Sequence, residues 1–206
     1  MNRLNMKKQV VVIHGGDTWT SYKQYIANLK LAKLDLGRVF KKGWKTTLQT
    51  KLGNRYDVVA PRMPNSMNAK YLEWKIWFDK HISHLNREVI LIGHSLGGIF
   101  LAKYLSENRF PKKIRGLFLV APPYESHNPK TPLADFIMPK NVKRLEAISD
   151  KVYLYHSTDD KMVPTPEFSP FLKVLPNAKF RIFKNRGHFI GATFPELVRD
   201  IKVLYR

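Results

Sequence analysis

One serine, one acidic residue and one histidine in this chain have the order and the setting that nucleophilic catalysis requires. Ser95 stands in the sequence GHSLGG, directly after the apolar run VILI and before residues at helical spacing. Glycines around a serine at a strand-to-helix turn are typical of a nucleophile elbow, which exposes the hydroxyl above a sheet. A serine hydroxyl needs a general base, and the base needs a third group that orients it. Asp160 and His188 follow in the order expected of a Ser-Asp-His triad, so the sequence predicts that these three residues are catalytic.

Either of two adjacent aspartates in STDDKMVP has a position suited to the acid of the triad. We assign Asp160, because its place before the Val-Pro pair is where the acid usually lies, and we keep Asp159 as the alternative. The oxyanion of a tetrahedral intermediate also needs backbone N–H donors. We expect one from Leu96, the residue after the nucleophile, and one from Gly16 in the loop HGGD after the first predicted strand.

Other residues near these motifs are expected to have supporting roles rather than to take part in catalysis. His94 is expected to pack or to support its neighbours rather than to act as an acid or base, and His14 is expected to shape the oxyanion loop. Three apolar residues flank the motifs and are candidates for the lining of a substrate pocket. They are Trp19, Met63 and Phe189.

Neither a metal site nor a nucleotide site is indicated by the sequence. His81 and His84 are spaced i and i+3 on a predicted helix, but no third ligand accompanies them. GHSLGG lacks the Gly-Lys-Ser/Thr of a phosphate-binding loop, and no Gly-x-Gly-x-x-Gly follows the first predicted strand. We therefore expect no metal and no organic cofactor, since water completes the hydrolysis of an acyl-enzyme.

Apolar runs of strand length alternate with stretches of helical spacing, which predicts a mostly parallel, three-layer α/β sheet. Strands are predicted at 9–13, 56–60, 89–92, 114–121, 151–156 and 179–183. Helices are predicted within 22–53, at 70–85, after Ser95, and at 141–149, 166–175 and 195–204. Ligands of such sheets bind beyond the carboxyl ends of the strands. The motifs HGG, GHSLGG, STDDKMVP and NRGHF all follow strands, so we expect them on one edge of the sheet.

The predicted helix at 70–85 has an amphipathic pattern and is expected to cross over between two parallel strands. The pattern rests on Leu72, Ile76, Trp77 and Ile82. Trp74 and Trp77 are both expected to serve helix packing.

The length of 206 residues favours one domain over 1–206, with a small lid or loop at 123–139. No apolar run approaches the roughly 18 residues of a membrane span, and the apolar stretch at 10–13 is shorter than the roughly 7–15 residues of a signal-peptide core. The chain has no cysteine, so neither a disulfide framework nor a thiolate site is available. We expect the protein in the cytoplasm.

The formal net charge of +20 is the unusual feature of the composition. A field of this sign attracts nucleic acid, anionic lipid and acidic substrates. The basic residues are nevertheless spread over several short groups, FKKGWK, FPKKIRG, PKNVKR and KFRIFKNR, and no nucleic-acid-binding motif accompanies them. We therefore expect no specific nucleic-acid partner.

The chain resembles the α/β-hydrolase superfamily in four motifs, VVVIHGG, ILIGHSLGG, STDDKMVP and RGHF. In its small size it resembles one branch of that superfamily, the retinoblastoma-binding-protein-nine-like serine hydrolases. The resemblance spans nearly the whole chain. It implies a fold with minimal or no cap around a sheet of about six strands. It also implies a triad of Ser95, Asp160 and His188. The segments 18–43 and 124–139 are longer than the family's minimal core requires, and both are expected near the entrance of the site.

The function expected from these residues is that of a serine esterase, which forms an acyl-enzyme on Ser95 and acts on a small ester-type substrate. Two alternatives stay open. A protein of this fold can have little turnover and serve as a binding or protein-interaction module, because a fold does not guarantee a function. The charge alone would also suit a protein that binds nucleic acid or anionic surfaces.

Overall fold

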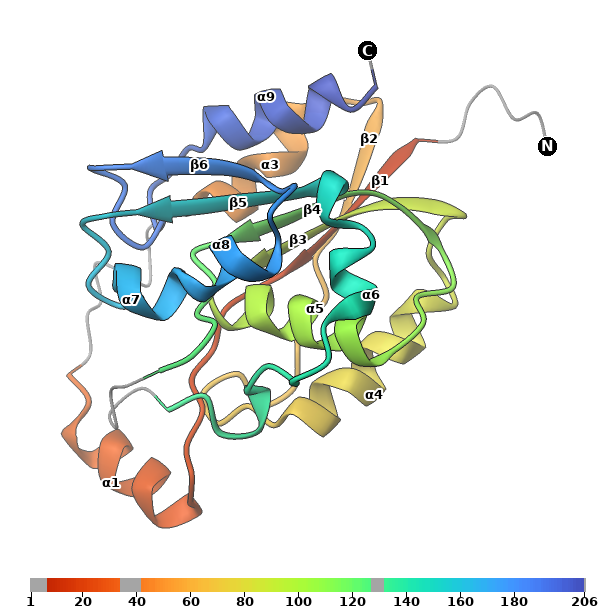
Figure 1. Ribbon diagram of the computed structural model, residues 1–206. Helices are drawn as coiled ribbons and strands as arrows, with labels where there is room; N and C mark the ends of the chain where they lie inside the picture. Colours follow the sequence, from red (N-terminus) through yellow and green to blue (C-terminus); the bar gives the residue numbers. More distant parts are fainter. Residues whose placement is uncertain (1–6, 34–41, 127–131, 206) are drawn as a thin grey trace.

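The computed structural model describes residues 7–33, 42–126 and 132–205. Within them, six strands form one sheet in the order β2-β1-β3-β4-β5-β6 (Figure 1), and all neighbouring strands are parallel. The strands are β1 (Lys8–Ile13), β2 (Tyr56–Val59), β3 (Glu88–His94), β4 (Lys113–Val120), β5 (Val152–Ser157) and β6 (Lys179–Phe183). The predicted α/β sheet is confirmed, with strand bounds shifted by one or two residues at most of the ends.

The order of the strands creates a switch point between β1 and β3. The chain runs from β1 outward to β2, then returns past β1 to β3 and continues in the opposite direction. Crevices for ligands form at the carboxyl ends of strands beside such a point. HGG follows β1 and the elbow sequence follows β3, so both predicted motifs lie at this point of the sheet.

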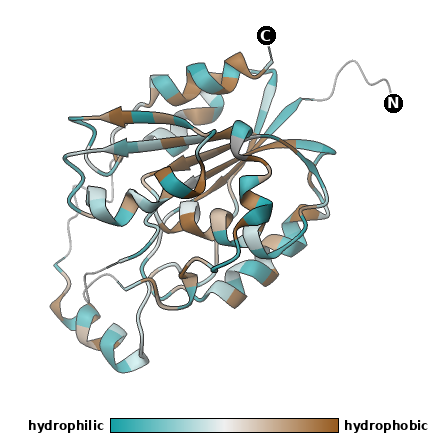
Figure 2. Cartoon of the chain, viewed as in Figure 1, coloured by the Kyte–Doolittle hydropathy of each residue, from teal (hydrophilic) through white to brown (hydrophobic). Residues whose placement is uncertain are grey.

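Helices cover both faces of the sheet and give three layers (Figure 1). The helices are α1 (Tyr22–Leu31), α3 (Trp44–Leu52), α4 (Tyr71–Ile82), α5 (Leu96–Glu107), α6 (Lys143–Glu146), α7 (Thr165–Phe168), α8 (Pro170–Val174) and α9 (Pro195–Val203), with 3-10 turns η2 (Ala134–Phe136) and η3 (Ser149–Lys151). Successive side chains of a strand point to opposite faces. Val10 and Val12 accordingly pack with α3 and α9, whereas Val11 and Ile13 pack with α4 and α5. Figure 2 shows the central strands as the most hydrophobic part of the chain.

The buried face of α4 differs from the predicted one. Trp74 and Phe78 are fully buried, and both make edge-to-face contacts with Phe100 of α5. The exposed large apolar residues include Leu72, Ile76 and Trp77. Of the predicted set only Ile82 is buried, and Trp77, which is 40% exposed, does not share the packing role of Trp74. The prediction was wrong because two large aromatic rings, four residues apart, take the face that meets the sheet.

The single helix predicted over 166–175 is two short helices, α7 and α8. Pro170 lies at the first position of α8, where its missing N–H costs nothing. The same residue inside a longer helix would remove a hydrogen bond and clash with the preceding turn. The chain therefore stops α7 at Phe168 and begins a new helix after Ser169.

Helix α1 and the loop predicted at 123–139 differ in their contact with the core. Helix α1 buries none of its residues, and it lies apart from the sheet in Figure 1. Of the loop predicted at 123–139, residues 127–131 lie outside the described residues. In its described portion, Leu133 and Phe136 are buried in the core cluster that includes α5.

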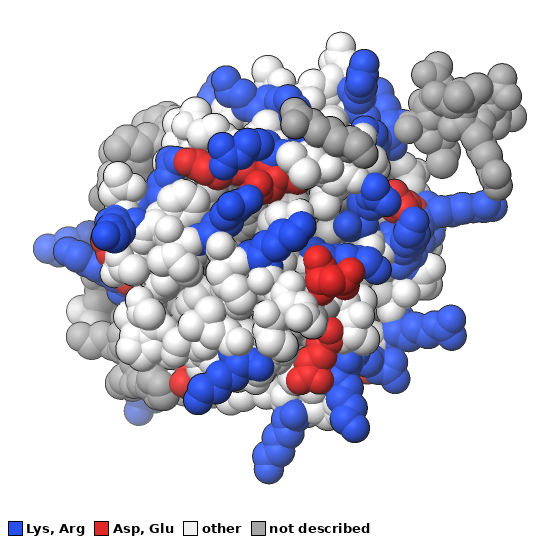
Figure 3. All heavy atoms as spheres, turned by 45° about the horizontal axis from the view of Figure 1, so that its top comes forward, with Lys and Arg blue, Asp and Glu red and all other residues white. Residues whose placement is uncertain are grey.

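The surface carries its positive charge broadly. Figure 3 shows Lys and Arg side chains spread across the visible face, with fewer acidic groups between them. In the part of the chain that the structure describes, none of the helices has both the length and the apolar character needed to cross a bilayer.

Candidate active site

Ser95 occupies the turn between β3 and α5 in a backbone conformation that non-glycine residues rarely adopt, with φ 55° and ψ −123°. Its N–H donates to the carbonyl oxygen of Val120 at 2.8 Å, which ties the turn to β4. The neighbouring glycines allow close backbone approach. A Cβ on Gly97 would lie 2.4 Å from the carbonyl oxygen of Ile13, and one on Gly93 would lie 2.3 Å from that of Gly97. The glycines of GHSLGG therefore permit the tight crossing of β1, β3 and α5 under the serine.

His188 and Asp160 form a buried pair at the carboxyl ends of β6 and β5. The His188 Nδ1–H donates to Asp160 Oδ2 at 2.8 Å, and the other carboxylate oxygen accepts the N–H groups of Met162 at 2.8 Å and Val163 at 3.0 Å. Burial by itself raises the pKa of the Asp160 carboxyl, but the hydrogen bonds and the charge of His188 outweigh it, so this pKa is lowered. Asp160 is thus held as a carboxylate against the imidazole.

Asp159 has a different place from its neighbour. Its side chain accepts hydrogen bonds from the hydroxyl of Ser157 and from the N–H of Gly187, the latter at 3.0 Å. Gly187 has φ +49°, a left-handed conformation that glycine adopts without strain. Asp159 therefore anchors the loop that presents His188, and Asp160 alone of the two contacts the imidazole.

The loop after β1 lies directly beside the serine. A Cβ on Gly15 would come within 3.6 Å of Ser95 Oγ. The loop is fixed by two backbone N–H groups: that of Asp17 donates to Ser66 O at 2.8 Å, and that of Met63 donates to His14 Nε2 at 2.9 Å.

The two N–H groups proposed for the oxyanion are not engaged elsewhere. Within the described residues, neither the N–H of Gly16 nor that of Leu96 makes a hydrogen bond. Leu96 opens α5, and the first N–H groups of a helix have no partner inside it. Both residues line a cavity together with Ser95.

A histidine and a lysine that the sequence analysis did not combine complete the site. His94 Nε2 donates to the carbonyl oxygen of His188 at 2.8 Å, and its Nδ1 lies 3.0 Å from Nζ of Lys45. Burial, Lys45 and His188 together lower the pKa of His94 well below its usual value, so His94 is neutral. It supports the loop of the catalytic candidate, as expected of a packing residue. No local motif marks Lys45, which belongs to the basic group FKKGWK.

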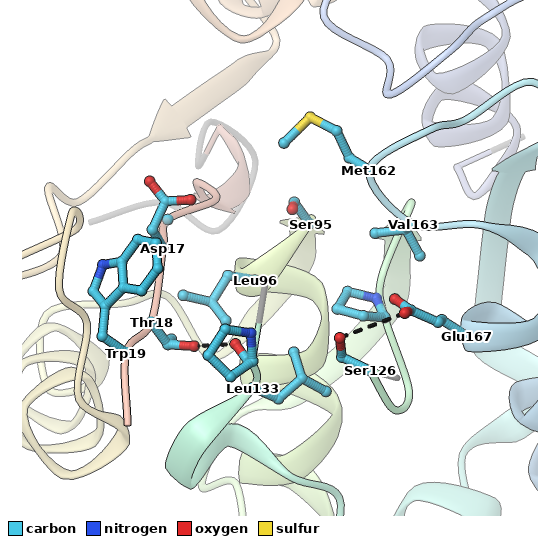
Figure 4. Close-up of a pocket in the computed structure, with 13 residues that line it drawn as sticks. Asp17, Thr18, Trp19, Ser95, Leu96, Ser126, Leu133, Met162, Val163 and Glu167 are labelled. Carbon is cyan, nitrogen blue, oxygen red and sulfur yellow. Dashed lines mark hydrogen bonds between the residues drawn. The ribbon is translucent and has the colours of Figure 1, made fainter. Parts of the chain in front are cut away.

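Two cavities meet at Ser95. The smaller, of about 70 Å³, lies between Trp19, Leu96 and Leu133, with Glu167 at its far side (Figure 4). The larger, of about 700 Å³, is open and contains the imidazole of His188. Ser95 lines both of them.

Ser95 and His188 line the same large cavity. Within the described residues, no hydrogen bond joins Ser95 Oγ to His188. Catalytic hydrogen bonds are often long in the free enzyme and tighten when substrate binds.

The three residues predicted to line a substrate pocket lie in three different places. Trp19 lines the small cavity and Phe189 lines the large one. Met63 lines neither of these two, because its side chain is buried in the core. Among the described residues, no group of three or more His, Cys, Asp or Glu is arranged to hold a metal ion.

The parallel sheet, the strained serine after β3 and the supporting loops define an α/β hydrolase. A model of the serine hydrolase family matches residues 39–194, and the chain belongs to this family. The serine hydrolase RBBP9 of Rattus norvegicus is 27% identical over 149 residues, which make up 71% of this chain and 77% of the rat protein. The resemblance found in the sequence is therefore confirmed, and the protein is an enzyme of the α/β-hydrolase type.

Solved structures share the fold at low sequence identity. The ydeN gene product of B. subtilis superposes with a TM-score of 0.68 at 17% identity, covering 97% of this chain and 99% of that one. A carboxylesterase of the thaumarchaeon Nitrososphaera gargenis gives a TM-score of 0.61 at 16% identity, covering 97% and 89%. The thioesterase domain from the curacin biosynthetic pathway gives 0.60 at 14%, covering 97% and 91%. At these identities the likeness is one of fold.

Proposed function

We propose that this serine hydrolase is an esterase that works through an acyl-enzyme on Ser95. His188 acts as the general base and acid, and Asp160 orients it. The N–H groups of Gly16 and Leu96 bind the oxyanion. The substrate class is a small ester.

The observation that carries the proposal is the buried pair of His188 and Asp160 beside the strained serine. The 2.8 Å hydrogen bond to Asp160 commits Nδ1 of the imidazole as a donor, so the neutral ring has its lone pair on Nε2. A base of this tautomer can accept the proton of a serine hydroxyl. The open cavity that Ser95 shares with His188 gives an ester room to approach both groups.

The reaction has two steps, formation of the acyl-enzyme and its hydrolysis. Ser95 Oγ attacks the ester carbonyl while its proton passes to His188 Nε2, and the carbonyl oxygen becomes an oxyanion held by two N–H donors. As the carbonyl re-forms, the bond to the alcohol breaks and His188 returns the proton to the leaving oxygen. Water repeats the sequence on the acyl-enzyme, which releases the acid and restores the free serine hydroxyl.

Labelling with a fluorophosphonate tests the nucleophile directly, because the reagent forms a covalent bond with an activated serine. Intact mass should show a single adduct on the wild-type protein, no adduct on Ser95→Ala and strongly slowed labelling of His188→Ala. Ser83→Ala, at the exposed end of α4, serves as the control and should label like the wild type.

Two other results are informative. Full ester hydrolysis by Ser95→Ala would refute the proposal. Labelling of Ser95 without turnover of short-chain and long-chain esters would instead favour the alternative of a binding protein on a hydrolase fold.

A further inference from the structure

A basic side chain lies inside the catalytic cavity. Trp44 begins α3 and is buried against the site, where its indole N–H donates to the carbonyl oxygen of Phe189 at 2.8 Å. The ring also meets His94 edge to face. Because Trp44 is fixed in this way, the next residue, Lys45, is held at the wall of the large cavity, where it is partly buried.

The ammonium group of Lys45 has unused donors. A lysine ammonium carries three N–H bonds. One of them reaches Nδ1 of His94 at 3.0 Å, and Nζ makes no other hydrogen bond within the described residues. No carboxylate of the described chain lies within ion-pair distance of it. Burial lowers the pKa of Lys45 to about 8, so the group is mostly charged at pH 7 while poorly solvated.

The other titratable groups of this cavity do not neutralise the lysine. His14, His94 and His188 line it together with Asp17, its acidic residue. Asp17 has an interaction of its own, and among the described residues no ion pair joins it to Lys45. A negatively charged ligand group would therefore gain both a charge partner and hydrogen-bond donors at Lys45.

The position of His188 decides which half of an ester lies near Lys45. The general acid has to reach the leaving oxygen, so the leaving group lies on the side of the imidazole. His188 lines the large cavity and is absent from the lining of the small one. The alcohol half of the substrate therefore occupies the cavity of about 700 Å³, and the acyl half fits the space of about 70 Å³ beside Leu96.

We propose that Lys45 determines substrate specificity by binding an anionic group, such as a carboxylate, on the leaving-group half of an ester with a short acyl chain. This inference rests on the proposed esterase function, because it uses the reaction geometry of Ser95 and His188. The net charge of +20 acts in the same direction, since a positive field raises the encounter rate of anionic substrates.

A pair of esters that differ in one charge tests the inference. 4-Acetoxybenzoate and methyl 4-acetoxybenzoate carry the same acetyl group, but only the first has an anionic leaving group. The quantity to compare is the ratio of their kcat/KM values in the wild type, Lys45→Met and Lys45→Arg. Lys42→Met, with its exposed side chain three residues earlier, is the matched control.

We expect the ratio of anionic to neutral ester to fall about tenfold or more in Lys45→Met, because a charge-assisted hydrogen bond is lost. Lys45→Arg should keep most of the preference, and Lys42→Met should keep all of it. If the ratio is unchanged in Lys45→Met, the inference is wrong, and an equal loss of activity on both esters would show that the residue is only structural.

Calorimetry with 4-hydroxybenzoate, the released alcohol half, gives a second readout that needs no turnover. Its binding should weaken about tenfold or more in Lys45→Met. If Lys45→Met is active and changes neither the ratio of the two esters nor the binding of 4-hydroxybenzoate, the inference about Lys45 is wrong while the esterase proposal is unaffected. If the wild-type protein binds 4-hydroxybenzoate through Lys45 but neither reacts with the fluorophosphonate nor hydrolyses the esters, the esterase proposal is wrong and Lys45 is still an anion-binding residue.

Discussion

Replacing each of the two adjacent aspartates by asparagine separates the partner of the catalytic histidine from the anchor of its loop. In Asp160→Asn, one oxygen can still accept the two N–H groups of Met162 and Val163. The amide NH₂ then faces Nδ1 of His188, where the carboxylate oxygen stood at 2.8 Å. Flipping the amide would restore the contact with the imidazole but break two hydrogen bonds, each worth about 1 kcal/mol net.

The favoured amide orientation donates to the imidazole and therefore forces the wrong tautomer. Nδ1 of His188 becomes an acceptor, Nε2 carries the hydrogen, and the ring cannot take a proton from Ser95. Loss of the correct tautomer in a Ser-His-Asp triad costs about 10⁴-fold in kcat. At about 1.4 kcal/mol for each tenfold, this equals roughly 5.5 kcal/mol of transition-state stabilisation.

Asp159→Asn should behave differently, because its side-chain oxygen can keep the N–H of Gly187 and the hydroxyl of Ser157. We expect kcat to fall by less than about tenfold, the effect of a slightly loosened loop. Steady-state hydrolysis of a short-chain ester at pH 7 measures both variants, and circular dichroism controls for folding. Equal losses in the two variants, or a loss of less than tenfold in Asp160→Asn, would refute the reasoning.

Three further predictions follow from other parts of the structure. Ser95→Gly should have a free energy of unfolding about 1 kcal/mol or more higher than that of Ser95→Ala in thermal denaturation, because only glycine adopts a φ of 55° without strain. Equal stability of the two variants would argue against strain at the elbow. Trp74→Ala should lose about 3–5 kcal/mol of unfolding free energy in urea titrations, whereas Trp77→Ala, at a side chain 40% exposed, should lose about 1 kcal/mol or less; the reverse order would contradict the observed face of α4. The preference for 4-acetoxybenzoate over its methyl ester should decline as pH rises through about 8, since Lys45 loses its charge above its pKa; a preference that stays constant to pH 10 would count against this role.

The sheet could be predicted because its evidence is local in sequence. Each buried strand is a short apolar run, and a parallel sheet buries both faces of such a run. The motifs HGG, GHSLGG and NRGHF then needed only the rule that ligands meet the carboxyl ends of strands. Their shared edge was therefore predictable before any distance was known.

The face of α4 was not predictable in the same way. The spacing of Leu72 and Ile76 fits one helical stripe, and the i+4 spacing of Trp74, Phe78 and Ile82 fits another. Periodicity does not choose between two apolar stripes on one helix. The choice is made by the rings of Phe100 in α5 and Phe136 in η2, which lie far from α4 in sequence.

The lysine of the site could not be identified for a related reason. In the sequence, Lys45 is one of 36 basic residues and stands in a group with other lysines. Its place in the cavity follows from the burial of Trp44 against a loop 145 residues further along the chain. A contact of that range leaves no periodicity and no spacing rule. The two aspartates were open for a similar reason, since only the direction of each side chain distinguishes them.

Helix α1 offers a practical consequence of having no buried residue. The chain lacks cysteine, so one cysteine introduced there would be a unique attachment point for a dye or a solid support. Tyr22, which is 70% exposed, is a suitable position. Immobilisation through α1 would leave both faces of the sheet covered by their own helices, so the enzyme could be held on a surface without disturbing its core.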